Sequence, residues 1–401
     1  MTQTIQSLPT GRERYFDPFD PALHADPYSR YALARESAPL CQGPHGLTVV
    51  TRHRDVSAAL RDTRLGHGPT TAPNRIFSFL GLDPPEHGPL RRVAAQFFGP
   101  RTISALAPRI SGFVDDLLDT ALQKQHVDLL GEFAYPLSLR VICSLFDLPE
   151  QDQPWIRAQT PPIGRLLDPP YSISGPDLAA ARQAAAVFVA YLREQITHRR
   201  RHPGPDLLSR LISHADSGPT LTPRGLIPMC ALLLMAGYET TANIIANGAL
   251  ALLRHPAQLE AARARTTDGL LDPAAMDELL RYDSPIQITF RTVQQETAVA
   301  GTALSPGTPV ALLIGSANRD PRAFARPERL DLQRAPNPHL SFGAGIHFCL
   351  GAPLARLEAG LALGHLLART RHLELAGDPS HKDITAAVRG LNDLPLALTP
   401  R

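Results

Sequence analysis

Lysine is almost missing from this chain of 401 residues, in which only Lys124 and Lys382 occur. Lys and Arg together number 40 and Asp and Glu number 38, so arginine carries nearly all of the positive charge and the formal net charge is +2. A chain so close to neutrality has no overall electrostatic attraction to nucleic acid or to an anionic membrane surface. We therefore expect no nucleic-acid partner and no membrane partner.

Cysteine is also scarce, and its spacing excludes one class of site. The four cysteines, Cys41, Cys143, Cys230 and Cys349, lie far apart and form no CxxC pair. A structural zinc site needs several ligands at short spacing, which this pattern does not supply.

Long apolar runs are missing as well. The most apolar run, Met229 to Ala236, is far shorter than the ~20 residues that span a bilayer. The N-terminus lacks the apolar stretch of a signal peptide. We expect a cytoplasmic protein with reduced thiols.

The pattern of apolar residues predicts a mainly α (α+β) fold with small sheets. Spacings of three and four residues predict helices over 178–201, 273–282 and 352–370, and a segment that is apolar nearly all round predicts a buried central helix from about 224 to 253. Short strands are predicted within 46–54 and 288–293, followed by a terminal hairpin. The segment 166–177 is dense in Pro, Ser and Gly and predicts a surface loop. No clear break divides the chain, so we expect one domain over 1–401, with 1–20 as an irregular arm.

The stretch HLSFGAGIHFCLG (339–351) holds the most constrained cysteine, Cys349. Its glycines allow positive φ and close approach of the backbone to a flat cofactor. The helix predicted just beyond Cys349 would direct its N-terminal amides at the sulfur and stabilise a thiolate. A zinc site with His347 lacks at least two further ligands, and a GxGxxG phosphate loop fails because Phe348 occupies the third glycine position. A small buried cysteine and the thiolate of a redox cofactor both remain compatible with these residues alone.

FGAGIHFCLG resembles the haem-binding loop of bacterial cytochromes P450, which has the pattern FGxGxHxCxG. The resemblance implies that Cys349 is the axial thiolate ligand of haem b (iron protoporphyrin IX) and that O2 is a co-substrate. It also implies that the other motif residues surround the cofactor, namely Phe342, Gly343, Gly345, His347 and Gly351.

A second motif of that family stands about 70 residues earlier, where Glu278-Leu-Leu-Arg281 matches the pattern ExxR. Three-residue spacing places both side chains on one helix face, where they can join an ion-pair network. The resemblance places the third member of the network at Arg329, in PERLD. This network would support the scaffold behind the haem.

A third motif, AGYETT (236–241), is similar to the AGx[DE]TT pattern of the family's central helix. Gly237 lowers helix stability by ~1 kcal/mol, and threonine hydroxyls compete for carbonyls one turn back, so the helix can open locally. Taken alone, the pattern also fits a simple kink with a solvent-facing glutamate. Beside the other two motifs, it implies that Glu239 and Thr240 guide protons during catalysis.

Arginine and histidine donors for the haem propionates form a fourth group. DPPEHGPLRR (83–92) resembles the family's DPPxHxxLR segment and supplies His87 and Arg91, four residues apart. Arg291 matches the usual propionate arginine, and His347 is a further candidate.

The resemblance implies a cytochrome P450 fold with a long central helix over the haem, and a monooxygenase that oxidises a small organic molecule, such as a natural-product intermediate. Electrons would come from a separate ferredoxin and ferredoxin reductase, and we expect a monomer. One alternative is oxidative coupling or another non-hydroxylating oxidation, and another is a P450-like scaffold that binds a ligand without catalysis. The predicted substrate pocket includes Leu232, Ala236, Ile286, Gln287, Thr289 and Asn392, with 166–177 as a lid.

Overall fold

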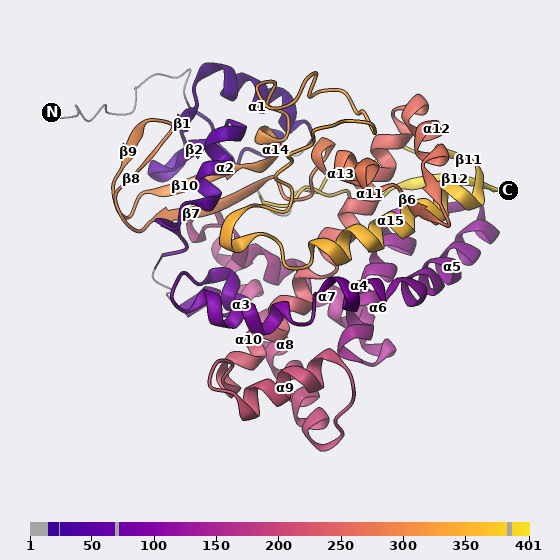
Figure 1. Cartoon of the computed structure of the whole chain (residues 1–401), viewed down its shortest axis with the longest axis horizontal. Helices are drawn as coiled ribbons and strands as arrows, with labels where there is room; N and C mark the ends of the chain where they lie inside the picture. Colours follow the sequence, from indigo (N-terminus) through magenta and orange to yellow (C-terminus); the bar gives the residue numbers. More distant parts are fainter. Residues whose placement is uncertain (1–14, 24, 69–71, 383–386) are drawn as a thin grey trace.

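The computed structural model describes residues 15–23, 25–68, 72–382 and 387–401, with side chains described outside 72–76 (Figure 1). Helices make up most of it. They are α1 (Pro27–Ser37), α2 (His53–Arg61), α3 (His87–Ala95), α4 (Pro100–Ser104), α5 (Ala107–Lys124), α6 (Tyr135–Phe146), α7 (Gln153–Gly164), α8 (Gly175–Arg201), α9 (Leu207–Ser217), α10 (Pro223–Ala236), α11 (Glu239–Leu253), α12 (Pro256–Ala264), α13 (Pro273–Tyr282), α14 (Ile314–Ala317) and α15 (Ala352–Arg369).

Several helices begin where the sequence offers both a capping side chain and a proline in the first turn. Ser174 caps α8, Thr222 caps α10 and Asp272 caps α13, each by accepting a hydrogen bond from a backbone N–H of the first turn. A proline follows each cap at a position where no N–H is needed.

The largest sheet has the strand order β1-β2-β10-β7-β3. Its strands are β1 (Leu40–Gln42), β2 (Thr48–Val50), β10 (Pro309–Leu313), β7 (Ile288–Val293) and β3 (Leu65–Gly66). Gly66 pairs with Thr292 across β3 and β7, which brings the segment after β3 next to Arg291.

Three smaller sheets complete the fold. One has the order β11-β12-β4, from β11 (Thr370–Leu375), β12 (Pro395–Pro400) and β4 (His126–Asp128). The others are the pairs β5 (Thr266–Thr267) with β6 (Leu270–Leu271) and β8 (Thr297–Val299) with β9 (Thr302–Leu304). In Figure 1 the five-stranded sheet lies at one side of the molecule, and helices fill the rest.

The predicted fold class is confirmed, and several predicted elements have nearly the expected bounds. The helix 273–282 coincides with α13, and 178–201 lies within α8. Strands β11 and β12 form the predicted terminal pair. The loop predicted at 166–177 includes the 3-10 turn Pro170–Ser172 and overlaps the turn Arg165–Leu167, but its last three residues belong to α8, which begins at Gly175.

One expectation needs correction. The central helix is not continuous, because α10 ends at Ala236 and α11 begins at Glu239.

Residues 1–14 of the predicted irregular arm lie outside the described part of the chain. In its remaining residues, Tyr15 forms an isolated parallel bridge with Gln42, and the Phe16 N–H donates to the Gln42 carbonyl.

Two helical segments are long and apolar enough to cross a membrane by length and composition, Leu129–Phe146 and Pro223–Leu253. Polar residues interrupt both segments, so neither forms a continuous apolar run in the sequence. Within their most apolar windows, 67% and 72% of the residues are buried inside the protein. Both segments therefore have the burial of helices in the core of a large globular protein.

Candidate functional site

A cavity of about 620 Å³ lies between the α10–α11 junction, the cysteine loop, β7 and the segment 166–171. Its walls are mostly apolar, as ligand cavities usually are. Four residues of the predicted pocket line it: Leu232, Ala236, Ile286 and Thr289. Leu166 to Tyr171 of the predicted lid line it as well.

Two residues of the predicted pocket do not line this cavity. Gln287 is buried and donates to the Ser284 carbonyl at 2.6 Å and to the Tyr28 hydroxyl at 3.3 Å. Gln287 lines instead a separate small cavity together with Tyr31 and Arg389. Asn392 is exposed and donates to Ser380 Oγ at 2.8 Å within the C-terminal loop. Both predictions were wrong.

The cysteine loop is shaped by two glycines with φ of 70°, Gly343 and Gly345. At Gly345 a Cβ would lie 2.4 Å from the Leu60 carbonyl oxygen, so this glycine allows the loop to approach α2. Gly345 itself does not line the cavity, whereas Phe342, Gly343, His347 and Gly351 do. The Cys349 N–H donates to the Phe342 carbonyl at 2.8 Å and closes the loop.

Cys349 lines the same cavity, and its sulfur lies at the start of α15. Burial raises the pKa of the Cys349 thiol, while backbone N–H groups of Gly351 and Ala352 and the guanidinium of Arg91 oppose that rise. Coordination to a metal cation deprotonates a thiol outright. The surroundings of the sulfur are therefore suited to a thiolate that is bound to a metal.

Three histidine rings converge beside the cysteine loop. The His347 ring lies 4.4 Å from that of His87 and 4.9 Å from that of His67. Each has a buried Nε2 atom without a hydrogen-bond partner in the described part of the chain. Burial lowers the pKa of His67 to about 3 and that of His347 to about 2, so both rings are neutral.

Two arginines border the same end of the cavity. Arg91 lines it from α3 and donates to the Phe348 carbonyl. Arg291 is buried on β7 and donates to Thr289 Oγ1 at 3.0 Å, and burial lowers its pKa to about 10.

These donors fit an acidic group. Buried polar atoms are normally paired, so three unpaired imidazole nitrogens beside two guanidinium groups suit the two carboxylates of a haem. Within the described residues, no group of three or more His, Cys, Asp or Glu could hold a metal ion by itself.

No sequence motif indicated His67 as a site residue. Its position depends on Asp83, whose carboxylate accepts hydrogen bonds from the His67 N–H at 2.8 Å and the Gly68 N–H at 3.3 Å. These contacts fix the end of β3 beside β7. A side chain placed by a contact across 16 residues leaves no periodic signal in the sequence.

The α10–α11 junction contains the predicted proton-delivery residues Glu239 and Thr240, which form an acid–alcohol pair. Thr240 Oγ1 donates to the Ala236 carbonyl at 3.1 Å and Thr241 Oγ1 to the Gly237 carbonyl at 3.4 Å, so both hydroxyls bind carbonyls one turn back. Glu239 and Thr240 both line the cavity. Glu239 thus faces the cavity, and the solvent-facing alternative is not what the structure shows. Burial raises the pKa of Glu239, and the Lys382 ammonium opposes that rise.

The ExxR pair is fully buried on α13. Arg281 Nε donates to Glu278 Oε2 at 2.7 Å, and Arg281 Nη1 donates to the Asn318 and Pro327 carbonyls at 2.9 Å. The predicted third member is wrong, because Arg334 Nε lies 3.0 Å from Glu278 Oε2. Arg329 is exposed and contributes only its carbonyl, which accepts from Arg281 Nη2 at 3.0 Å.

Comparison with known proteins places this geometry in one family. Residues 270–392 match the family model for cytochrome P450. The chain is 36% identical over 402 residues to cytochrome P450 107B1 of Saccharopolyspora erythraea, covering 94% of this chain and 96% of that protein.

Two solved structures are similar over nearly the whole chain. CxnD, a P450 for C–S bond formation in chuangxinmycin biosynthesis, has a TM-score of 0.87 at 31% identity and covers 98% of this chain and 100% of its own. P450BioI in complex with an acyl carrier protein carrying hexadec-9Z-enoic acid has a TM-score of 0.85 at 34% identity, covering 93% and 98%. Members of this family are haem-thiolate oxidoreductases that use O2 as a co-substrate and oxidise small molecules. The chain belongs to the cytochrome P450 family.

Proposed function

We propose that this monooxygenase oxidises a largely apolar, small organic molecule, an intermediate of natural-product biosynthesis, with Cys349 as its axial thiolate. The observation that carries the proposal is the shared cavity. Cys349 lies at one wall, and Glu239 and Thr240 lie at the helix junction, with apolar side chains around the remaining space. A mostly apolar wall with few polar groups selects ligands by shape and by burial of apolar surface.

In this proposal the cofactor-holding residues act as a set. His67, His87, His347, Arg91 and Arg291 hold the haem carboxylates, and Cys349 holds the iron. Haem with a thiolate ligand supplies the activation of O2 for oxidation of the substrate. These residues would hold the cofactor beside the apolar part of the cavity, where a substrate would bind.

Glu239 and Thr240 supply protons to the site. The Thr240 hydroxyl is held at the opened helix by the Ala236 carbonyl, and the Glu239 carboxylate faces the same cavity. A carboxyl group with a raised pKa exchanges a proton near neutral pH more readily than an ordinary surface glutamate.

The segment 165–172 covers the cavity and acts as a lid in this proposal. Leu167 and Tyr171 are each 41% exposed and also line the cavity. The Tyr171 ring packs edge-on against Phe19 at 5.9 Å. Movement of this segment would expose apolar side chains through which a substrate enters.

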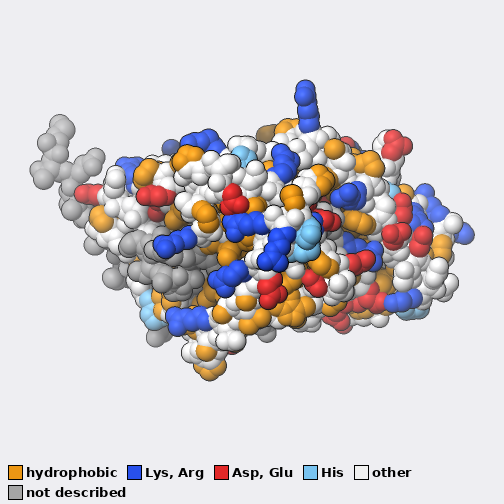
Figure 2. Space-filling model, turned by 90° about the horizontal axis from the view of Figure 1, so that it is seen from below, with side chains coloured by type: hydrophobic (Ala, Val, Ile, Leu, Met, Phe, Trp, Pro, Cys, Tyr) orange, Lys and Arg blue, Asp and Glu red, His pale blue; other side chains and the backbone are white. Residues whose placement is uncertain are grey.

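In this proposal the enzyme is a monomer in the cytoplasm. A separate ferredoxin and its reductase supply its electrons. Phe348, next to the cysteine, is 42% exposed, and Arg91 holds its carbonyl. Figure 2 shows the face at the bottom of Figure 1, where basic side chains lie among acidic and apolar ones. Complementary charge between such a surface and a redox partner would affect the encounter rate more than the affinity.

A coupling reaction is the second candidate, because the similar structure CxnD is described as forming C–S bonds. The two functions are separated by one experiment. Compounds that shift the spin state of the ferric protein are incubated with redox partners under 18O2. One 18O atom in the product supports oxygen insertion, whereas product formation without 18O overturns it in favour of coupling.

A further inference from the structure

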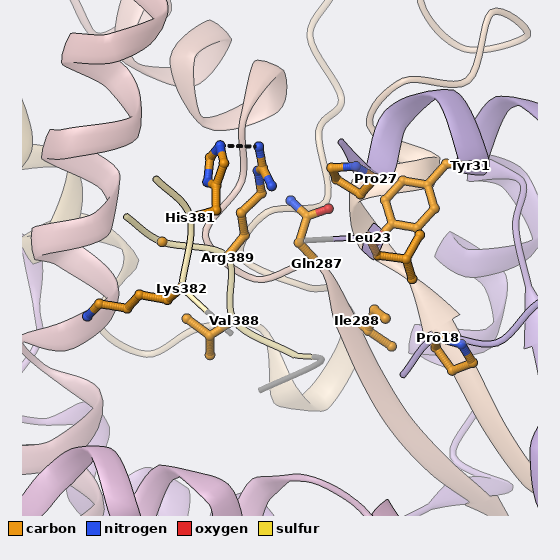
Figure 3. Close-up of a pocket in the computed structure, with 11 residues that line it drawn as sticks. Pro18, Leu23, Pro27, Tyr31, Gln287, Ile288, His381, Lys382, Val388 and Arg389 are labelled. Atoms are coloured by element: carbon orange, nitrogen blue, oxygen red, sulfur yellow. Dashed lines mark hydrogen bonds between the residues drawn. The ribbon is translucent and has the colours of Figure 1, made fainter. Parts of the chain in front are cut away.

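Lys382 is one of only two lysines in the chain, and it lies in the C-terminal loop between β11 and β12. Its backbone N–H donates to the Gly390 carbonyl at 3.0 Å. The residue borders two spaces, the main cavity and a small cavity of about 20 Å³ on the other side of the loop. Figure 3 shows that its side chain runs away from the hydrogen-bonded pair His381 and Arg389.

The ammonium group of Lys382 is held in place by Tyr135 on α6. Lys382 Nζ donates to the Tyr135 hydroxyl and lies 4.7 Å from the centre of the ring. Tyr135 is buried, and burial raises the pKa of its hydroxyl, so the acceptor is a neutral phenol. A buried hydrogen bond together with a cation–π contact fixes a side chain that would otherwise be flexible.

A chain of contacts connects this loop with Glu239. A Cβ on Gly390 would lie 2.2 Å from Asn243 Oδ1, so the loop backbone lies directly against Asn243. Asn243 Nδ2 in turn donates to the Glu239 carbonyl at 2.9 Å. The Lys382 loop and the first turn of α11 therefore pack as neighbours.

The charges of Lys382 and Glu239 stabilise each other electrostatically. Burial raises the pKa of Glu239 and lowers that of Lys382, and the charge of each residue opposes the shift of the other. Among the described residues, Arg157 on α7 also acts on Lys382: it lies 4.6 Å over the Tyr135 ring and disfavours a charged Lys382. Asp128 also acts on Tyr135.

We propose that Lys382, held by Tyr135, is a positioning residue whose fixed charge acts on the Glu239 carboxylate in the cavity that both residues line together with Thr240. This inference rests on the proposed role of Glu239 in proton delivery. Lys382 exchanges no proton in it and acts only through its charge and fixed position. Without that charge nothing from Lys382 would oppose the effect of burial, and the pKa of Glu239 would rise further.

The first test does not depend on catalysis. Trace acetylation across a pH series, followed by mass spectrometry, reports the pKa of Lys382 with the exposed Lys124 as the reference in the same sample. In the Glu239→Gln variant the half-labelling pH of Lys382 should fall by about one unit while that of Lys124 stays the same. An unchanged half-labelling pH for Lys382 would overturn the proposed pairing.

The second test measures coupling, the ratio of product formed to electrons consumed, against pH. Lys382→Met should reduce coupling at pH 7 and move the midpoint of its pH dependence upward, because Glu239 then ionises at higher pH. Lys382→Arg should restore much of the loss, and Tyr135→Phe should give an intermediate shift. The same midpoint in wild-type and Lys382→Met protein would contradict the positioning role. Failure of the proposed function would instead appear as absence of product in the wild type, with the labelling shift intact.

Discussion

Arg334 shares the buried carboxylate of Glu278 with Arg281. Its Nε lies 3.1 Å from Glu278 Oε1 and 3.0 Å from Oε2, while its Nη1 donates to the Ala325 carbonyl at 2.7 Å. The Asp331 N–H also donates to Glu278 Oε1 at 2.9 Å. The Glu278 carboxylate thus connects α13, through hydrogen bonds and an ion pair, to the irregular segment that precedes the cysteine loop.

Replacement of Arg334 by Met should lower the free energy of unfolding by ~3–5 kcal/mol, because it leaves the buried Glu278 charge with one cation fewer. Arg329→Met should change it by less than ~0.5 kcal/mol, since the exposed side chain contributes no ion pair to Glu278. Urea unfolding monitored by circular dichroism measures both variants. Equal losses in the two variants would show that the third cation is assigned incorrectly.

Gly237→Ala should destabilise the protein by ~1–3 kcal/mol through overpacking. A Cβ there would lie 2.6 Å from Ile142 Cδ1 and 2.9 Å from the Leu233 carbonyl oxygen. Gly112→Ala in α5 is the matched control, because nothing lies within 4 Å of its Cβ position. This variant should increase the free energy of unfolding by up to ~1 kcal/mol. The account of the helix junction fails if thermal unfolding shows the opposite order.

Loss of haem tests the role of His67. In His67→Leu the haem should transfer to apomyoglobin at least about tenfold faster than in the wild type, because a hydrogen bond to a charged group contributes ~1.5–3 kcal/mol. His126→Leu, at an exposed position on β4, is the control and should leave the rate unchanged. Identical rates for both variants would remove His67 from the cofactor site.

Glu358 gives the protein a predictable dependence of stability on pH. It is fully buried on α15 and accepts a hydrogen bond from Ser138, and burial raises its pKa from 4.5 to about 8. The folded state therefore binds more protons than the unfolded state between these pH values, so this residue's contribution to stability falls as pH rises from 4.5 to 8. Relative to the wild type, Glu358→Gln should gain stability over that range and level off above it. Urea unfolding from pH 5 to 9 measures the difference, and a constant difference would contradict the raised pKa.

Local signals predicted much of the fold and the motif residues. Helix α13 has a capping Asp272, a proline at its start and regular apolar spacing, so its bounds followed from the sequence. The acid–alcohol pair and the cysteine loop also carry their information within a few residues.

The site residues that were predicted wrongly or missed have positions that depend on contacts distant in the sequence. Arg329 and Arg334 lie in one irregular segment without periodicity, and only the packing against α13 decides which guanidinium meets Glu278. His67 is placed by Asp83, and Lys382 by Tyr135 on another helix. No spacing rule connects these pairs.

The most direct test of the central claim is the absorption spectrum of the reduced protein under carbon monoxide. Ligation by the Cys349 thiolate predicts a Soret band near ~450 nm in the wild type and its loss in Cys349→His. A fully haem-loaded wild type without that band, or a Cys349→His variant that keeps it, would contradict the assignment of Cys349 as the axial ligand.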